Sequence, residues 1–226
     1  MSEAPATLSS AAYVSLRRDI LDGVLTPGRK LRIEEACART GATSTPVREA
    51  LNQLVMEGFV ERREQRGFIV AEVSAAELQE LTDARCWVEE TALRQAMAHR
   101  TQAWEDSIAV AFHRLARVPR STDDDVFKSN PDWELAHNNF HAALIATCPS
   151  RFITDFCRRL ADHAARYRRL AMSAAFPRRD VTAEHRALLE ATLDGRSDDA
   201  VTLLLAHYRL TAQFVRGTNS PEDRPT

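Results

Sequence analysis

The apolar residues of this chain change their spacing once, and that change limits the folds open to it. Up to residue 58 they recur every three or four positions, as on one face of a helix. The segment FVERREQRGFIVAEV, residues 59–73, alternates apolar and charged residues instead, with Arg66 and Gly67 at its middle, which is typical of a β-hairpin. From Ser74 onward no strand pattern follows. The sequence therefore predicts a mainly α fold with one hairpin.

Three helical patterns precede the hairpin. The first, SAAYVSLRRDILDG, ends at Gly23, and a Pro-Gly turn separates it from the short IEEACART, which ends at Gly41. In the third, TSTPVREALNQLVMEGFV, we expect Thr45 to cap the helix and Pro46 to occupy its first position. Helix, short helix, turn, helix and hairpin is the order of a winged helix-turn-helix. The third helix should bury one stripe, made of Val47, Leu51, Leu54 and Val55.

The third helix and the hairpin carry side chains that suit a DNA duplex. A helix is slim enough to enter the major groove, and its N-terminal amides and hydroxyls can meet phosphates. Arg48 lies one turn inside, where it can make two hydrogen bonds to guanine, and the hairpin arginines can follow the backbone or enter the minor groove. The residues predicted to contact DNA are Thr43, Ser44, Thr45, Arg48, Asn52, Arg62, Arg66 and Gly67.

The total charge gives the DNA prediction no support. The formal net charge is −2, and residues 1–73 carry ten Lys or Arg against ten Asp or Glu. The cations are nevertheless gathered at the first helix, the turn after it, the start of the third helix and the hairpin. The alternative is that Arg48 forms a surface ion pair and the hairpin is a structural cap. The basic hairpin in the expected place favours DNA.

The rest of the chain has the pattern of an all-α bundle. We expect a winged-helix domain over residues 10–73 and a helical domain over residues 74–217, with flexible tails at 1–9 and 218–226. The sequence predicts about six helices in the second domain, over residues 74–99, 101–117, 130–147, 149–173, 181–194 and 198–215.

Nothing in the sequence predicts export or membrane insertion. We expect no signal peptide, and no apolar run approaches the length of a membrane span. The cysteines form no CxxC pair and are most simply reduced thiols, so we expect a cytoplasmic protein. They are Cys37, Cys86, Cys148 and Cys157.

Four of the seven histidines form one pattern. His137 and His141 are one helical turn apart on an apolar face. His185 and His207 flank the turn DGRS at similar distances, about 15 Å along each helix, so an antiparallel pair of helices would bring their rings to the same height. A divalent metal would suit four inward-facing imidazoles, because neutral histidine is a common ligand for Zn, Ni, Cu or Fe. The alternative is four separate buried histidines bonded to carbonyls or carboxylates.

Arg85 and Glu89 are one turn apart beside an apolar stripe. One interpretation is a helix ion pair worth about 0.2–0.5 kcal/mol. The other is an effector site, in which the arginine lies at the edge of the histidine cavity and binds a carboxylate through two hydrogen bonds.

These motifs resemble those of a known family. ILDGVLTPGRKL, TSTPVREALNQLVMEGFV and RGFIV look like the winged helix of GntR-type transcription regulators. ARCWVEETALRQAMA, NNFHAALIATC and EHRALLEATLDGRSDDAVTLLLAHY resemble the FCD-type ligand domain of the FadR-like subgroup. The likeness covers about residues 10–215. It implies a homodimer that binds a palindromic operator, in the manner of a repressor, and releases it when a small organic acid enters the helical domain.

The resemblance also implies a metal held by an aspartate and three histidines, which by position are His141, His185 and His207. The aspartate position holds His137 here, and this neutral ligand favours Zn or Ni over Mn. A second departure is Ser44, which stands where the family usually has an arginine, so more of the DNA readout should fall to Arg48 and the hairpin. Arg85 matches the arginine on the first helix of the family's ligand domain.

The leading hypothesis is therefore a DNA-binding transcription regulator that is not an enzyme. One rival is a helical metalloenzyme acting on small carboxylates, with Glu184 and Glu89 as bases. The sequence contains no nucleophile elbow, phosphate loop or HExxH helix to support that rival. The other rival is a regulator whose histidines bind an acid directly, without metal.

Overall fold

The structure is a computed structural model that describes residues 7–123, 125, 127–175 and 179–218. The chain divides into two compact units, Met1–Ser74 and Ala75–Thr226. The predicted tails fall largely outside the described residues. Helix α1 nevertheless begins at Leu8, two residues inside the predicted tail, because the side chain of Thr7 accepts a hydrogen bond from the Ser10 amide and caps the helix.

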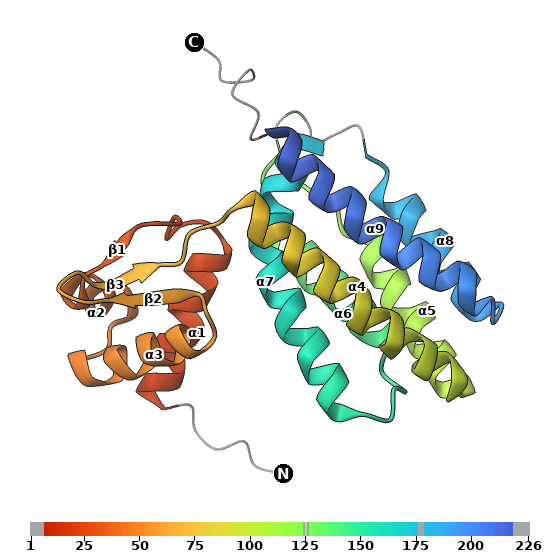
Figure 1. Cartoon of the computed structure of the whole chain (residues 1–226), viewed down its shortest axis with the longest axis horizontal. Coiled ribbons are helices and arrows are strands. Elements are labelled where there is room, and N and C mark those ends of the chain that lie inside the picture. Colours follow the sequence, from red (N-terminus) through yellow and green to blue (C-terminus); the bar gives the residue numbers. More distant parts are fainter. Residues whose placement is uncertain (1–6, 124, 126, 176–178, 219–226) are drawn as a thin grey trace. The chain divides into compact units, whose positions relative to one another are not determined.

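The N-terminal unit is a winged helix-turn-helix, as the sequence predicted (Figure 1). Its helices and strands are α1 (Leu8–Leu21), β1 (Lys30–Leu31), α2 (Ile33–Thr40), α3 (Ser44–Met56), β2 (Val60–Arg63) and β3 (Gly67–Val70). The strands form one antiparallel sheet in the order β1-β3-β2. The sequence missed β1, since two residues are too few to show alternation.

The core of this unit lies between α1, α3 and the sheet. Val47, Leu51 and Leu54 of α3 are fully buried, as predicted, and Val55 is half-buried. They pack in one apolar cluster with Leu16 of α1 and other residues of the unit. The opposite side of α3 is thereby left at the surface.

The expected cap of α3 was wrong. The helix begins at Ser44 with Thr43 as its N-cap residue, so Thr45 and Pro46 are the second and third helical residues. A proline is tolerated there because the first N–H groups of a helix have no partner within it. The hairpin turn also lies earlier than predicted, at residues 64–66. There Gln65 has a left-handed φ of 58°, and the Arg66 amide donates to the Arg63 carbonyl over 3.2 Å.

The C-terminal unit is a helical bundle, which confirms the predicted fold class. Helices α4, α7 and α9 pack against one another in one layer, and α5, α6 and α8 form a second (Figure 1). Buried apolar side chains of both layers, among them Leu93, Phe140 and Leu204, form the core. The helices are α4 (Ala75–Ala98), α5 (Gln102–Arg117), α6 (Pro131–Leu144), α7 (Arg151–Ala175), α8 (Val181–Leu193) and α9 (Ser197–Thr218).

Helices α8 and α9 pack side by side, joined by a tight turn. Gly195 has a left-handed φ of 75° in this turn, a conformation that glycine adopts without strain. This reversal brings the two later histidines to the same level of the bundle. Along the described part of the chain, no helix has the length and apolar character needed to cross a membrane.

Candidate functional site

Four histidines meet inside the C-terminal bundle. His137 and His141 come from α6, His185 from α8 and His207 from α9. All four are buried, with 1–8% of each residue exposed. One nitrogen from each ring lies within 4.8 Å of the others, and the Nε2 atoms of His141 and His185 are 3.2 Å apart. The sequence spacing had placed all four rings on inward-facing helix stripes, but it left open whether they meet or stay separate.

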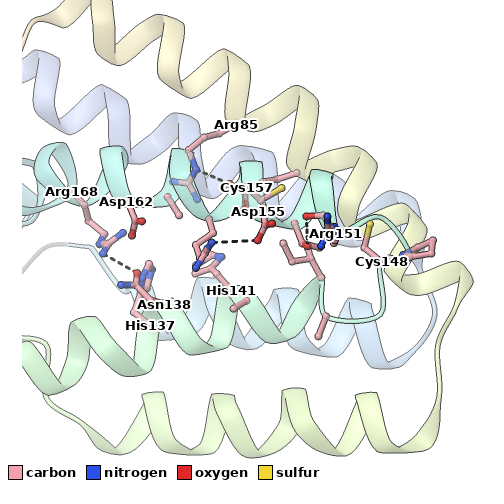
Figure 2. A pocket seen from close by; sticks show the side chains of 18 residues that line it. Arg85, His137, Asn138, His141, Cys148, Arg151, Asp155, Cys157, Asp162 and Arg168 are labelled. Atoms are coloured by element: carbon pink, nitrogen blue, oxygen red, sulfur yellow. Dashed lines mark hydrogen bonds and ion pairs between the residues drawn. The ribbon is translucent and has the colours of Figure 1, made fainter. Parts of the chain in front are cut away.

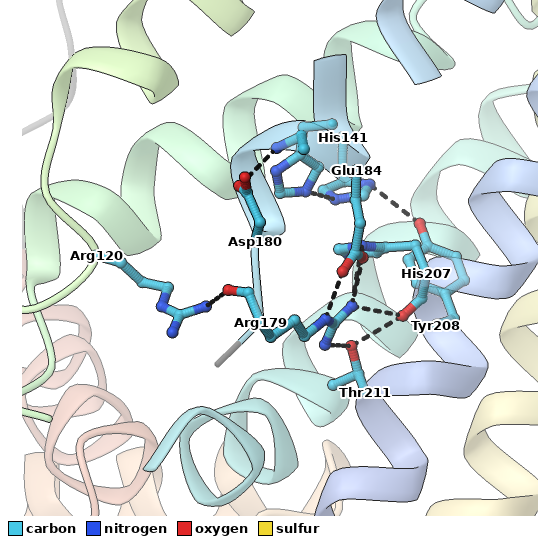
Figure 3. A network of polar contacts seen from close by, with 10 residues as sticks. Arg120, His141, Arg179, Asp180, Glu184, His207, Tyr208 and Thr211 are labelled. Atoms are coloured by element: carbon cyan, nitrogen blue, oxygen red, sulfur yellow. Dashed lines mark hydrogen bonds and ion pairs between the residues drawn. The ribbon is translucent and has the colours of Figure 1, made fainter. Parts of the chain in front are cut away.

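Two of the rings are oriented by hydrogen bonds at their outer nitrogens (Figure 3). His207 Nδ1 lies 2.7 Å from a carboxylate oxygen of Glu184, so this nitrogen carries the proton and Nε2 keeps its lone pair. His141 Nδ1 lies 3.2 Å from the Tyr208 hydroxyl, which itself donates to Glu89. The hydroxyl oxygen therefore accepts from His141, and the Nε2 lone pair of His141 faces His185. Histidines that bind metals are commonly oriented in this way, by a hydrogen bond at the ring nitrogen that does not face the ion.

His137 has no such partner. Its ring stacks on Trp133, with centroids 4.8 Å apart, and neither ring nitrogen finds a hydrogen bond among the described residues. Burying a polar atom without a hydrogen bond costs free energy. Two such nitrogens in one ring therefore indicate a site where a ligand binds. Burial lowers the pKa of all four histidines below the ordinary value. They are therefore neutral near pH 7, which is the form that binds metals.

Arg179 closes the cluster on the side of α8 and α9 (Figure 3). Its guanidinium makes two hydrogen bonds to Glu184, of 2.6 and 2.7 Å, and others to Thr211 and to the His207 carbonyl. Burial opposes the negative charge of Glu184, but the hydrogen bonds from Arg179 and His207 outweigh it and lower its pKa to about 2. Sequence reasoning missed Arg179, because this residue precedes α8 and meets the cluster only after folding.

Arg85 and Glu89 form a buried ion pair on α4, with 2.7 Å between Arg85 Nε and Glu89 Oε1. The expected helix ion pair is therefore present, but it is buried, so the small energy of an exposed pair does not apply to it. The Arg85 guanidinium also lies 3.8 Å from the centre of the Tyr208 ring, a cation–π contact. Burial raises the pKa of Tyr208, which keeps its hydroxyl protonated. Tyr208 thus links this pair to His141, a role that sequence spacing did not reveal.

A pocket of about 610 Å³ opens beside the histidines, between α4, α6 and α7 (Figure 2). His137, His141 and Arg85 line it, and so does Arg168 of α7, which sequence reasoning missed. The buried Arg168 pairs with Glu134 and donates to the Asn138 side chain over 3.2 Å. Farther along, the walls combine apolar and thiol side chains with charged ones. The first group includes Ala142, Ile145, Cys148, Cys157 and Ala161, and the second includes Arg151, Asp155, Arg158 and Asp162.

The cysteines are free thiols in the described structure. Burial raises the pKa of Cys157 to about 12, so its thiol stays protonated and unreactive near pH 7. The remaining histidines stand apart from the cluster: His99 and His113 are exposed, and His163 is half-buried.

The residues predicted to contact DNA are all exposed in the N-terminal unit. Arg48 and Asn52 share the outer side of α3, while Arg62, Arg66 and Gly67 lie on the wing. Thr43, Ser44 and Thr45 lie at the N-terminal end of α3. Their placement agrees with a groove-reading helix and a backbone-contacting wing.

Comparison with known families matches this chain twice. Residues 8–70 match the bacterial regulatory proteins of the gntR family, and residues 80–210 match the FCD domain. The chain therefore belongs to the GntR family of transcription regulators that carry an FCD domain. This confirms the resemblance read from the motifs. The family consists of DNA-binding regulators and not enzymes, which removes the metalloenzyme rival.

Individual relatives support the assignment. The HTH-type transcriptional regulator BphR of Paraburkholderia xenovorans is 34% identical over 93% of this chain and 86% of its own length. The HTH-type transcriptional repressor GlaR of Escherichia coli is 35% identical over 69% of this chain and 70% of its own length. Among solved structures, E. coli McbR/YncC has a TM-score of 0.78 at 18% identity, covering 95% of this chain and 99% of that one, and so shares the fold.

Proposed function

We propose that this regulator is a repressor whose affinity for operator DNA is set by a small organic acid that binds in the α4–α6–α7 pocket, beside a divalent metal. The observation that carries the proposal is the cluster of four neutral histidines, of which His137 and His141 line that pocket and His137 has no hydrogen bond at either nitrogen among the described residues. Two relatives, GlaR and RspR of E. coli, are named as HTH-type transcriptional repressors.

The histidine nitrogens fit a metal ion. Two nitrogens bound tetrahedrally to zinc at about 2.0–2.1 Å would lie about 3.3 Å apart. The observed 3.2 Å between the Nε2 atoms of His141 and His185 agrees with that spacing. Neutral nitrogen donors favour Zn or Ni over Mn, because Mn prefers carboxylate oxygens. His137, His141, His185 and His207 would hold the ion, which attracts an effector carboxylate when bound.

The chain's own residues prepare the pocket for such an acid. Glu184 and Tyr208 fix two rings so that their lone pairs face inward, and Arg85 adds a positive charge to the wall. The guanidinium of Arg85 is already bonded to Glu89 through Nε, which leaves its terminal NH groups as further donors. These contacts keep the donors rigid, so little order is lost when an acid binds.

A homodimer suits this mechanism, since a palindromic operator is read by two copies related by a twofold axis. The neighbouring helices α4 and α7 expose large apolar residues, with Trp87 at 72%, Phe152 at 76% and Phe156 at 47%. Large exposed apolar side chains gathered on adjacent helices favour an interaction surface. The effector would shift the dimer between two arrangements, of which one spaces the α3 helices to fit successive major grooves.

A gel-shift titration tests the regulatory part of the proposal. The full chain should bind an operator found by footprinting and release it when one acid from a panel of small carboxylates is added. A chelator added during the same titration separates the metal-dependent sensor from the metal-free one. Operator release that is unchanged by the chelator would favour direct binding of the acid by histidines.

Elemental analysis tests the metal centre. Purified wild-type protein should contain about one zinc or nickel ion per chain, and the paired variant His185→Ala with His207→Ala should contain none. The variant His99→Ala is the matched control, because His99 is exposed and separate from the cluster. A wild-type protein that holds no metal after incubation with zinc would end this part of the proposal.

A further inference from the structure

The chain does not balance the charge of its own metal centre. A divalent ion held only by neutral imidazoles keeps both of its positive charges. Three carboxylates near the cluster are already matched, each with one arginine, in the pairs Glu89 with Arg85, Glu134 with Arg168 and Glu184 with Arg179. Asp162 also lines the pocket, but its oxygens are not among the atoms that gather at the centre. Buried charge needs a partner, so the missing anions must come with the ligand.

The pocket wall next to the histidines holds unused hydrogen-bonding atoms. Among the described residues, Arg168 Nε and both nitrogens of His137 are buried without a hydrogen bond. Only 7% of Arg168 is exposed, and both residues line the pocket. Figure 2 shows the Arg168 guanidinium turned toward Asn138, the neighbour of His137 on α6. A guanidinium with a spare N–H is suited to a second carboxylate close to the metal centre.

Part of the remaining pocket wall suits hydrocarbon, and the charged residues Arg151, Asp155, Arg158 and Asp162 also line the pocket. Its volume of about 610 Å³ lies within the range of about 300–1,000 Å³ that is typical of small-molecule sites, so the pocket has room for more than a two- or three-carbon acid. Ala142, Ile145 and Ala161 line this space from α6 and α7. An apolar body that displaced water from these walls would gain about 25 cal/mol for each Å² buried.

We propose that the effector is a dicarboxylate with its two carboxylate groups close together on an apolar body. One carboxylate lies at the histidine cluster beside Arg85, and the second accepts hydrogen bonds from Arg168 and Asn138. This inference rests on the proposed function, since it assumes that an organic acid is sensed at the histidine cluster. Beyond the proposed function, the inference specifies that the acid carries two negative charges and that its two carboxylates lie close together.

Isothermal titration calorimetry on the full-length zinc-loaded protein tests this with matched acids. Phthalate and benzoate share a ring and differ by one carboxylate, and terephthalate moves the second carboxylate to the far side of the ring. Succinate and butyrate form a second pair without the ring. We expect the Kd of phthalate to be at least tenfold lower than those of benzoate and terephthalate, and succinate to bind more tightly than butyrate.

Variants of the Arg168 pair test the position of the second carboxylate. Because Arg168→Gln alone would leave Glu134 buried and unpaired, it is combined with Glu134→Gln. This double variant should bind phthalate no more tightly than benzoate. The matched control Arg159→Gln, at an exposed position of the same helix outside the pocket lining, should keep the preference. If the double variant fails to fold, Arg168→Lys is the alternative. Lysine keeps a positive charge beside Glu134 but lacks the paired guanidinium donors, so we expect the preference for phthalate over benzoate to decrease.

The outcomes separate this inference from the proposed function. Equal affinities for phthalate and benzoate in the wild type would overturn the inference alone, as would a preference that survives in the folded double variant. If none of the five acids binds and operator binding is intact in a gel shift, the inference and the organic-acid part of the proposed function both fail.

Discussion

Replacing Glu184 by glutamine should change how the stability of this protein depends on pH. The carboxylate is held between Arg179 and His207, and only 25% of its side chain is exposed. These contacts lower its pKa from the ordinary value of 4.5 to about 2. At about 1.4 kcal/mol for each tenfold change in proton affinity, this difference contributes about 3 kcal/mol to the free energy of unfolding at pH 7.

The sign follows from the direction of the pKa change. Because the folded pKa lies below the unfolded one, the contribution is complete above pH 4.5 and is lost as the pH falls through about 2. At pH 3 about 1 kcal/mol of this contribution should remain, so the advantage of the wild type over Glu184→Gln should shrink by about 2 kcal/mol between pH 7 and pH 3. Glutamine also leaves the Arg179 charge buried, but that cost does not depend on pH in this range.

Urea denaturation of the chelator-treated protein at several pH values measures this difference, since the metal then adds nothing to stability. Glu190→Gln is the matched control, because Glu190 is exposed on the same helix and should follow the wild-type curve. Wild-type and Glu184→Gln curves that run parallel from pH 7 to pH 3 would refute the reasoning. So would an equal effect in Glu190→Gln.

Three further changes test other parts of the molecule. Arg48→Ala should weaken specific operator binding in a gel shift by about 1–3 kcal/mol with an unchanged melting temperature, and unaltered affinity would remove Arg48 from the DNA contacts. Leu54→Ala should lower the free energy of unfolding of the N-terminal unit by about 2–5 kcal/mol. The control Met56→Ala, at an 89% exposed position, should stay within about 0.5 kcal/mol of the wild type. Trp87→Glu should shift the protein toward monomer in sedimentation velocity, and a variant that stays wholly dimeric would place the interface elsewhere.

Several parts of the site were predictable because they repeat with a local period. His137 and His141 are one turn apart, and His185 and His207 are spaced about a tight turn, so the closeness within each pair follows from helix geometry and one chain reversal. The meeting of the two pairs depends on how the helices pack in the bundle. Helix α3 was predictable in the same way, from its apolar stripe. The ends of elements were not, because caps such as Thr43 depend on a few local dihedral angles.

The sequence by itself determined which faces of the helices are buried, where the hairpin lies and which histidines turn inward, because each is written in residues only a few positions apart. Only the tertiary structure decided what surrounds the histidines. Arg168 meets Glu134 across 34 positions, Arg179 meets His207 across 28, and Tyr208 meets Glu89 across 119. Such pairs depend on how whole helices pack against one another. The spacing of residues within one helix shows which of its faces is buried, but it does not show which other helix covers that face.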